Sequence, residues 1–165
     1  MIDILMPIFR NPPVTSNYPS QLLKECAWTY ANAITCGQQK VVQSLVLEKG
    51  FYELAANVLR SETDLNFVIT LLAAILETLE CGDATENGTA FIELAEEAAL
   101  DDEIRRLEVV HAQMKSNESV EILAQAASCL ERFSQEQEYV KTLVDNDRAE
   151  SPIRNRTALL SYRMG

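Results

Sequence analysis

The sequence is poor in the residues that build metal sites, cross-links and tight loops. It has five glycines, five prolines, four cysteines, one tryptophan and one histidine among 165 residues. The cysteines form no CxxC pair and no histidine stands at zinc spacing from them, which excludes the common zinc modules. Without a Gly-rich phosphate loop or a Ser-His-acid grouping, we expect a protein that is not an enzyme, with no catalytic residue, metal or cofactor. We expect His111, beside Gln113 and Lys115, to lie in solvent with no nucleophile paired to it.

Long apolar runs and basic charge are also scarce. We find no segment long and apolar enough to cross a bilayer, and no signal-peptide pattern at the N-terminus. Cys26, Cys36, Cys81 and Cys129 are then expected to be small apolar side chains in a reducing compartment, the cytoplasm and nucleus. The formal net charge of -11 argues against binding to nucleic acid and favours a basic partner.

What is abundant favours helices, and the helices repeat. Hydrophobic residues make up 47% of the chain, and Ala, Leu, Glu and Gln are common. A shift of 45 residues takes the apolar residues of one predicted helix onto apolar residues of another, from Leu22, Leu23, Cys26, Ala27, Tyr30, Ala31 and Ile34 to Phe67, Val68, Leu71, Leu72, Ile75, Leu76 and Leu79. A period of this length, with a short helix pair followed by a longer helix, is typical of armadillo and HEAT arrays.

The pattern predicts three helical groups and a tail. We predict a partial repeat over residues 2–37 that begins with a short helix over 2–9, a repeat over 38–82 and a terminal repeat over 83–133. Residues 134–165 are predicted to be a helical extension and a flexible tail. The fold class is therefore predicted to be all-α, a right-handed armadillo-type solenoid of about two and a half to three repeats. The terminal repeat is acidic, with twelve acidic and four basic residues over 83–133.

Glycines mark the predicted helix ends. Gly37 and Gly82 are predicted to close two long helices, and Gly50 to form the corner between two short ones. In the terminal repeat Ala98-Ala99 stands at the corner in place of a glycine. The apolar faces of the last two predicted helices of that repeat are formed by Ile104, Leu107, Val109 and Val110, and then by Val120, Ile122, Leu123, Ala126, Ala127, Leu130 and Phe133.

The predicted helix over about 20–37 carries its tryptophan on the polar side. Gln21, Glu25, Trp28, Asn32 and Thr35 share one narrow arc, opposite an apolar face that is complete without Trp28. We interpret the arc as a surface that receives a ligand. The indole would hold the aliphatic stem of a Lys or Arg, Glu25 would take its charge, and Asn32 would hold the backbone of an extended peptide.

The later groups keep this arc polar but do not repeat its chemistry. The positions 45 residues on are Asn66, Thr70, Ala73, Glu77 and Glu80. A shift of 100 residues puts Gln125, Ser128 and Arg132 where Glu25, Trp28 and Asn32 stand. The arc is therefore predicted to face solvent throughout, and the first group alone combines a tryptophan with an asparagine.

These residues resemble the C-terminal part of importin-α, the armadillo-repeat adaptor of nuclear protein import. The resemblance covers roughly residues 2–133, about the eighth to tenth repeats of that family. It is carried by Lys24-Glu25-Cys26-Ala27-Trp28 with Asn32 and Gly37, by Leu45 to Gly50, and by Glu118 to Phe133 after the acidic stretch Ile92 to Leu107.

The resemblance implies an import adaptor that binds basic nuclear localisation signals. Trp28 would stack on a Lys or Arg stem, Asn32 would hold the peptide backbone, and Glu25 would meet a basic side chain. The periphery of this groove would be formed by Gln21, Thr35, Thr70 and Glu77. Since the family's basic importin-β-binding segment and earlier repeats have no counterpart in the sequence, importin-β is not expected to bind.

Other interpretations stay open. The chain would alternatively be a non-catalytic helical-repeat scaffold that docks the nuclear export receptor, or another protein, through its acidic last repeat. The residues of that surface would be Glu96, Glu97, Asp101 and Asp102. Trp28 would otherwise be a half-exposed packing residue, and the acidic residues the solvated faces of two helices.

Overall fold

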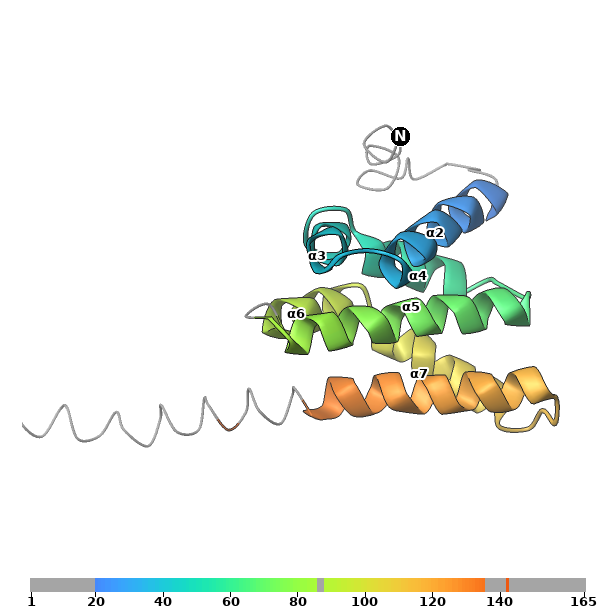
Figure 1. The fold of residues 1–165 in the computed structure, drawn as a ribbon. Helices are drawn as coiled ribbons and strands as arrows, with labels where there is room; N and C mark the ends of the chain where they lie inside the picture. Colours follow the sequence, from blue (N-terminus) through green and yellow to red (C-terminus); the bar gives the residue numbers. More distant parts are fainter. Residues whose placement is uncertain (1–19, 86–87, 136–141, 143–165) are drawn as a thin grey trace, which may run out of the picture. The chain divides into compact units, whose positions relative to one another are not determined.

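The computed structural model describes residues 20–85, 88–135 and 142. Two units divide the chain, Met1–Phe133 and Ser134–Gly165. Within the described ranges all regular structure is α-helical, which confirms the all-α class. The helices are α2 (Ser20–Thr35), α3 (Gln39–Leu47), α4 (Phe51–Leu59), α5 (Leu65–Asp83), α6 (Gly88–Glu97), α7 (Leu100–His111) and a helix over 117–135 (Figure 1). The helix predicted over 2–9 and the predicted tail lie outside the described residues.

Each helix packs on its counterpart in the next group. The helix α2 packs on α5, α3 on α6, and α4 on α7. Figure 1 shows α2, α5 and the 117–135 helix as successive long helices. The thiol of Cys129 in the 117–135 helix reaches the backbone oxygen of Leu72 in α5, with Sγ and O 3.8 Å apart. These contacts join the buried side chains into one continuous core.

Aromatic side chains link the groups inside this core. The ring centroids of Tyr30 and Phe51 lie 6.4 Å apart, those of Phe51 and Tyr52 5.7 Å, and those of Tyr52 and Phe91 6.5 Å. The Tyr52 hydroxyl lies 2.8 Å from Thr78 Oγ1, so the one polar atom that it brings into the core has a partner. A chain of rings therefore runs from α2 through α4 to α6.

The two short-helix corners use the same backbone conformation. Gly50 precedes α4 with a φ of 65°, and Ala99 precedes α7 with a φ of 52°. Left-handed backbone is unstrained for glycine and costs an alanine about 1–2 kcal/mol. The corner predicted at Ala98-Ala99 is thus present, formed by a residue that is strained there.

Gly82 does not end a helix, so its predicted capping role is wrong. It lies buried in the last turn of α5, and a Cβ added to it would meet Phe91 Cδ2 at 3.1 Å. The missing side chain lets α6 bring the Phe91 ring against the α5 backbone. Close packing, not helix termination, explains this glycine.

The terminal group buries only part of its predicted apolar pattern. Val109 is 72% exposed and Val120 62% exposed, and Val110 is also exposed, so their predicted positions on the apolar faces are wrong. The buried stripe of α7 follows the helical period, with Leu100, Ile104, Leu107 and His111.

His111 is therefore a core residue, contrary to the prediction that it lies unpaired in solvent. It is 4% exposed, and its Nδ1 lies 3.0 Å from Oγ of the buried Ser119. Ser116 Oγ donates to Ser119 Oγ at 3.1 Å and accepts from the Ser119 N–H at 3.1 Å. This hydrogen-bonded set joins the end of α7 to the start of the 117–135 helix.

An ion-pair cluster fixes α7 on α4. Glu103 accepts from Arg60 Nε and from Arg106 Nε, both at 2.8 Å, and Arg106 Nη2 donates to the Leu59 backbone oxygen at 2.7 Å. Burial alone would raise the pKa of Glu103, but the hydrogen bonds from Arg106 and Arg60 hold it below its ordinary value. At least one acidic residue of α7, Glu103, therefore stabilises the packing of α7 on α4.

The helix α5 corrects one further expectation. Among the described residues it is long and apolar enough to cross a membrane by length and composition, with a mean hydropathy of 1.6 over its most apolar window. Half of that window is buried inside the protein, against α2, α3 and α6. The core helix of a soluble protein has the same length and composition, so this property alone identifies no membrane span.

Candidate functional site

The candidate site is the outer arc of α2. This helix buries Cys26, Ala27, Tyr30, Ala31 and Ile34 against the core. The opposite side chains, Gln21, Glu25, Trp28, Asn32 and Thr35, are all exposed, and we call these five residues the Trp28 face. Their exposure was predictable from the helical period, whereas their function stays a prediction.

Trp28 is anchored on one side and open on the other. Its ring centroid lies 5.5 Å from that of Phe67 in α5, at an interplanar angle of 36°. Phe67 is 2% exposed beneath it, while Trp28 remains 44% exposed. The indole is held in place by an aromatic contact and still offers much of its surface to a ligand.

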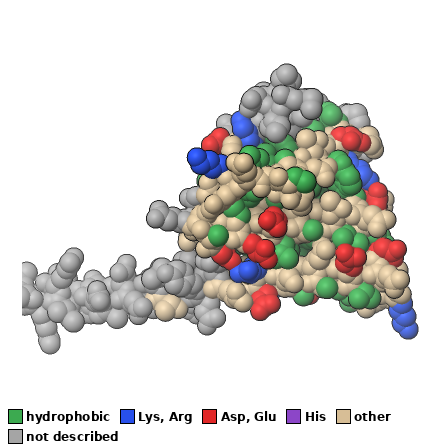
Figure 2. All heavy atoms as spheres, viewed as in Figure 1, with side chains coloured by type: hydrophobic (Ala, Val, Ile, Leu, Met, Phe, Trp, Pro, Cys, Tyr) green, Lys and Arg blue, Asp and Glu red, His purple; other side chains and the backbone are tan. Residues whose placement is uncertain are grey.

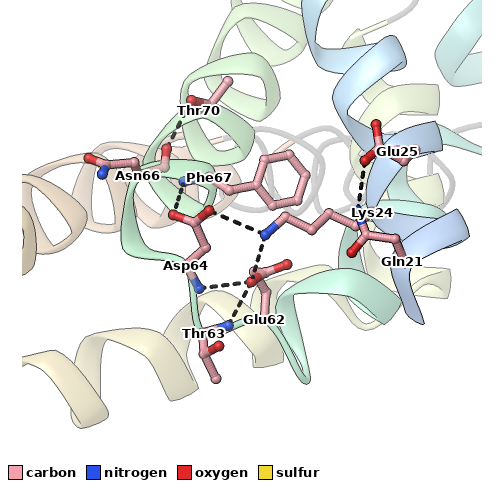
Figure 3. A network of polar contacts seen from close by, with 9 residues as sticks. All are labelled: Gln21, Lys24, Glu25, Glu62, Thr63, Asp64, Asn66, Phe67 and Thr70. Carbon is pink, nitrogen blue, oxygen red and sulfur yellow. Dashed lines mark hydrogen bonds and ion pairs between the residues drawn. The ribbon is translucent and has the colours of Figure 1, made fainter. Parts of the chain in front are cut away.

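Lys24 also contacts the Phe67 ring (Figure 3). Its Nζ lies 5.0 Å from the Phe67 ring centroid, 3.2 Å from Glu62 Oε1 and 3.3 Å from Asp64 Oδ2. Glu62 Oε1 also accepts from the backbone N–H groups of Thr63 and Asp64, each at 2.8 Å. Sequence reasoning missed this network, because its members are up to 40 residues apart.

The charge of Glu62 is stabilised in the network. Burial alone would raise the pKa of Glu62, but the Asp64 backbone N–H, the Lys24 ammonium and the Thr63 N–H hold it below its ordinary value. The side chain of Glu62 is 11% exposed, so this ion pair is partly desolvated. The chain thus holds one of its own ammonium groups between an aromatic ring and two carboxylates, beside Trp28.

Glu25 and Asn32 differ in how much of their bonding capacity is in use. Glu25 Oε1 accepts from Gln21 Nε2 at 2.7 Å, so Gln21 orients the carboxylate (Figure 3). The exposed carboxamide of Asn32 makes no hydrogen bond to any residue that the structure describes. The Thr35 hydroxyl donates to Ala31 O at 3.1 Å and to Asn32 O at 3.3 Å, back onto its own helix. Asn32 is therefore the open polar group of the Trp28 face, and Thr35 is committed.

The predicted groove periphery on α5 also contains one residue that is bonded within its own helix and one that is available to a ligand. The Thr70 hydroxyl donates to Asn66 O at 2.9 Å and is half-buried (Figure 3). Glu77 and Glu80 are exposed and lie on the Thr70 side of α5 by helical spacing. Of the predicted periphery, Glu77 remains as an available carboxylate, while Thr70 serves its own helix.

Positions of the 117–135 helix that match the Trp28 face are also polar. Gln125 Oε1 is buried and has no hydrogen-bond partner among the described residues. Arg132 forms an ion pair with Asp83 at the end of α5. Figure 2 shows the side where α5 and the 117–135 helix lie in front, with red Asp and Glu side chains spread over them and fewer blue ones.

The Trp28 face is exposed, and Gln21 at its start also lines a hollow. The hollow has a volume of about 200 Å³, and Trp28 does not line it. The lining residues are Gln21, Leu23, Lys24, Asn57, Val58, Ser61, Glu62 and Thr63. A ligand of the Trp28 face would therefore lie along the helices, as an extended chain does.

The second predicted surface follows the α6–α7 corner. Glu96, Glu97 and Asp102 are exposed and Asp101 is half-buried. Asp101 and Asp102 stand in the first turn of α7, where carboxylates stabilise the positive end of the helix dipole. The structure brings these four residues to one corner, where at least two have a local structural role. Among the described residues no group of three or more His, Cys, Asp or Glu side chains could hold a metal ion.

Comparison with protein families, curated proteins and solved structures finds no match for this chain.

Proposed function

We propose that this chain binds basic peptides along the Trp28 face, as the C-terminal repeats of a nuclear import adaptor of the importin-α type do. The observation that carries the proposal is the state of Trp28, which packs on Phe67 and is still 44% exposed. A carboxylate, Glu25, precedes it by about one turn and an uncommitted carboxamide, Asn32, follows it by about one turn. The proposed function places the protein in the cytoplasm and nucleus.

The helix packing supports the repeat architecture on which the proposal depends. Contacts of α2 with α5, α3 with α6 and α4 with α7 pair each helix with its counterpart. Gly50 and Ala99 give both short-helix corners a left-handed residue. Such one-to-one stacking is what armadillo-type repeats require, and a right-handed solenoid is the arrangement that we propose.

The chemistry of the face fits a lysine or arginine side chain. The stem would lie on the indole, the charge would approach Glu25, and Asn32 would hydrogen-bond the N–H and C=O of the peptide backbone. The Lys24 ammonium, held by Phe67, Glu62 and Asp64, is an example of the same chemistry within the chain. The exposed Glu77 and Glu80 would attract further basic residues.

The expected affinity is modest. A cation on one indole contributes about 0.5–2 kcal/mol to binding. The loss of conformational entropy when the peptide is ordered opposes binding. We therefore expect a Kd on the order of 1 mM or weaker for a basic peptide, and we expect added salt to weaken the binding further. Tighter binding would need further tryptophan-asparagine stations.

The test is a titration with a fluorescein-labelled basic peptide, followed by anisotropy at low and high salt. Trp28→Ala and Asn32→Ala should each weaken binding by about tenfold or more, because both groups contact the ligand. Val109→Ala is the matched control, since it removes an exposed side chain from α7 and should leave binding unchanged. Circular dichroism must show that each variant retains the helical content of the parent.

A scaffold that docks through Glu96, Glu97, Asp101 and Asp102 is the alternative. It has less support, because Asp101 and Asp102 already stabilise the start of α7. Glu96→Lys with Asp101→Lys separates the two functions in the same titration. Loss of peptide binding in that double variant, with binding kept in Trp28→Ala, would overturn the proposal in favour of the acidic corner.

A further inference from the structure

A larger hollow lies away from the Trp28 face, where α3, α4 and α6 meet. Its volume is about 470 Å³, within the range of about 300–1,000 Å³ that small-ligand sites occupy. It is lined by Val46, Gly50, Tyr52, Glu53, Asn57, Leu94, Glu97 and Ala98. None of these residues belongs to α2 or α5, although Asn57 also lines the smaller hollow beside the Trp28 face.

The lining of the hollow includes apolar side chains as well as polar ones. Val46 and Tyr52 are buried, and Leu94 and Ala98 are partly buried against the core. The Tyr52 hydroxyl is engaged with Thr78 inside the core, 2.8 Å away, and its ring is what remains for the hollow. The aliphatic part of a ligand side chain would move out of water here and contact apolar and aromatic side chains.

The rim of the hollow is acidic. Glu53 from α4 and Glu97 from α6 are exposed, and neither carboxylate makes a hydrogen bond or ion pair within the described part of the chain. Glu97 also stands in the last turn of α6, where the helix dipole adds negative potential. The α4 N-terminus has the opposite dipole, but Glu53 lies in its first turn and offsets it.

No lysine or arginine is among the residues that line the hollow, and Arg60, which contacts the lining residue Asn57, is held by another partner. Asn57 on the rim accepts from Arg60 Nη1 at 3.5 Å, and Arg60 Nε donates to Glu103 at 2.8 Å. The guanidinium of Arg60 is thus engaged with the α4–α7 cluster. Two carboxylates are therefore left without a cation among the residues that line the hollow.

We propose that this hollow binds an arginine or lysine side chain of a partner protein. Its aliphatic stem would lie on Val46, Tyr52 and Leu94, and its cationic end would lie between Glu53 and Glu97. The charge complementarity of the rim and the apolar lining residues select this ligand over an anion or a purely apolar group.

The test is an NMR titration of the ¹⁵N-labelled full chain with N-acetyl-arginine amide and, separately, with N-acetyl-citrulline amide. Citrulline has the same shape without the charge. The arginine probe should shift the backbone amide signals of Gly50, Glu53, Glu97 and Ala98, and the citrulline probe should bind at least tenfold more weakly. Equal binding of both probes would overturn the proposal, as would shifts spread over all acidic surfaces.

Variants give the matched comparison. Glu53→Gln with Glu97→Gln should weaken the arginine probe about tenfold, because both charge-assisted contacts are lost. Glu93→Gln removes the same charge from α6 outside the hollow and should change nothing. Binding that is insensitive to the double variant would contradict the proposal.

Two further arms identify the source of the cation and separate this site from the Trp28 face. A capped arginine peptide should bind at the hollow at least as well as agmatine, a free small molecule that carries the same guanidinium group. Exclusion of the peptide with binding of agmatine would overturn the assignment to a partner protein. Trp28→Ala should leave these shifts intact, and shifts confined to the Trp28 and Asn32 amides would place the cation on the Trp28 face instead.

Discussion

The second helical group, α3 to α5, and the third, α6 to the 117–135 helix, share a packing plan but differ in content. Seven of the nine residues of α4 are buried, against four of the twelve residues of its counterpart α7. The third group adds polar ties, the Arg60–Glu103–Arg106 cluster and the His111–Ser119 hydrogen bond. The same helix packing therefore accommodates an α7 with fewer buried residues than α4.

The largest predicted difference concerns the first helix of each group. Phe91 in α6 is fully buried against Tyr52 and Gly82, whereas Val42 holds the corresponding position in α3 when the two corners are aligned. Phe91→Ala should lower the free energy of unfolding by about 4 kcal/mol, because it leaves a large cavity. Val42→Ala should cost about 2 kcal/mol. Urea unfolding followed by circular dichroism measures both, and equal costs would show that α6 does not depend on its aromatic residue.

The next largest effect concerns the connection after the second helix of each group. Glu62 accepts two backbone N–H groups and pairs with Lys24, so Glu62→Ala should cost about 2 kcal/mol of unfolding free energy. Glu53→Ala, also in the second group but without such bonds among the described residues, is the control and should cost less than about 0.5 kcal/mol. The same urea titration checks both, and a Glu62→Ala cost no larger than the control would reduce this network to a surface feature.

A reciprocal pair of substitutions sharpens the comparison of the corners. Ala99→Gly should stabilise the chain by about 1 kcal/mol, since glycine relieves the left-handed strain. Gly50→Ala should destabilise it by about 1 kcal/mol through the backbone alone, because the added Cβ would meet only Glu53 Oε2, at 3.9 Å. Thermal unfolding of the two variants should move in opposite directions, and a shift of the same sign would contradict equivalent corners.

The smallest predicted effect is a pH dependence that differs between the groups. Burial, with Arg106 nearby, lowers the pKa of His111 below its usual 6.5. The unfolded chain therefore takes up the proton first, and stability should fall as the pH drops below about 6.5. The pKa of Glu62 is also lowered, so its contribution should be lost only as the pH falls below about 4.5.

Unfolding free energies measured across these two pH ranges check the assignment. His111→Gln should flatten the upper range and leave the lower one, whereas Glu62→Gln should reduce the loss only in the lower one, to which Asp64 and Glu103 also contribute. If the unfolding free energy of the unmodified chain did not fall below about pH 6.5, His111 would take up its proton in the folded protein at its ordinary pKa.

Much of the first and second groups was predictable from the sequence because their signals are local. The Trp28 helix, the Gly50 corner and the exposure of the five-residue arc all follow from helical period and glycine placement. The third group misled the same reasoning, since adjacent valines at 109 and 110 suggested a core position. The spacing of Leu100, Ile104, Leu107 and His111 was the signal that would have placed His111 inside.

The site was predictable in its exposure and not in its contacts. Nothing local indicates that Phe67 lies under Trp28, or that Lys24 reaches Glu62 and Asp64 across the α2–α5 contact. Gly82 shows the same limit, because its role depends on Phe91 from another helix. Contacts between distant segments are fixed by tertiary packing, which periodicity does not specify.

Trp28 is the sole indole of the chain, and it sits at a seam between two helices and the solvent. Its emission will therefore start from a partly hydrated environment and will respond chiefly when α2 separates from α5. Far-ultraviolet ellipticity averages over all helices instead. Denaturation curves recorded by the two signals will coincide if the groups melt as one cooperative body, and the emission curve will lead if the first helix frays ahead of the others.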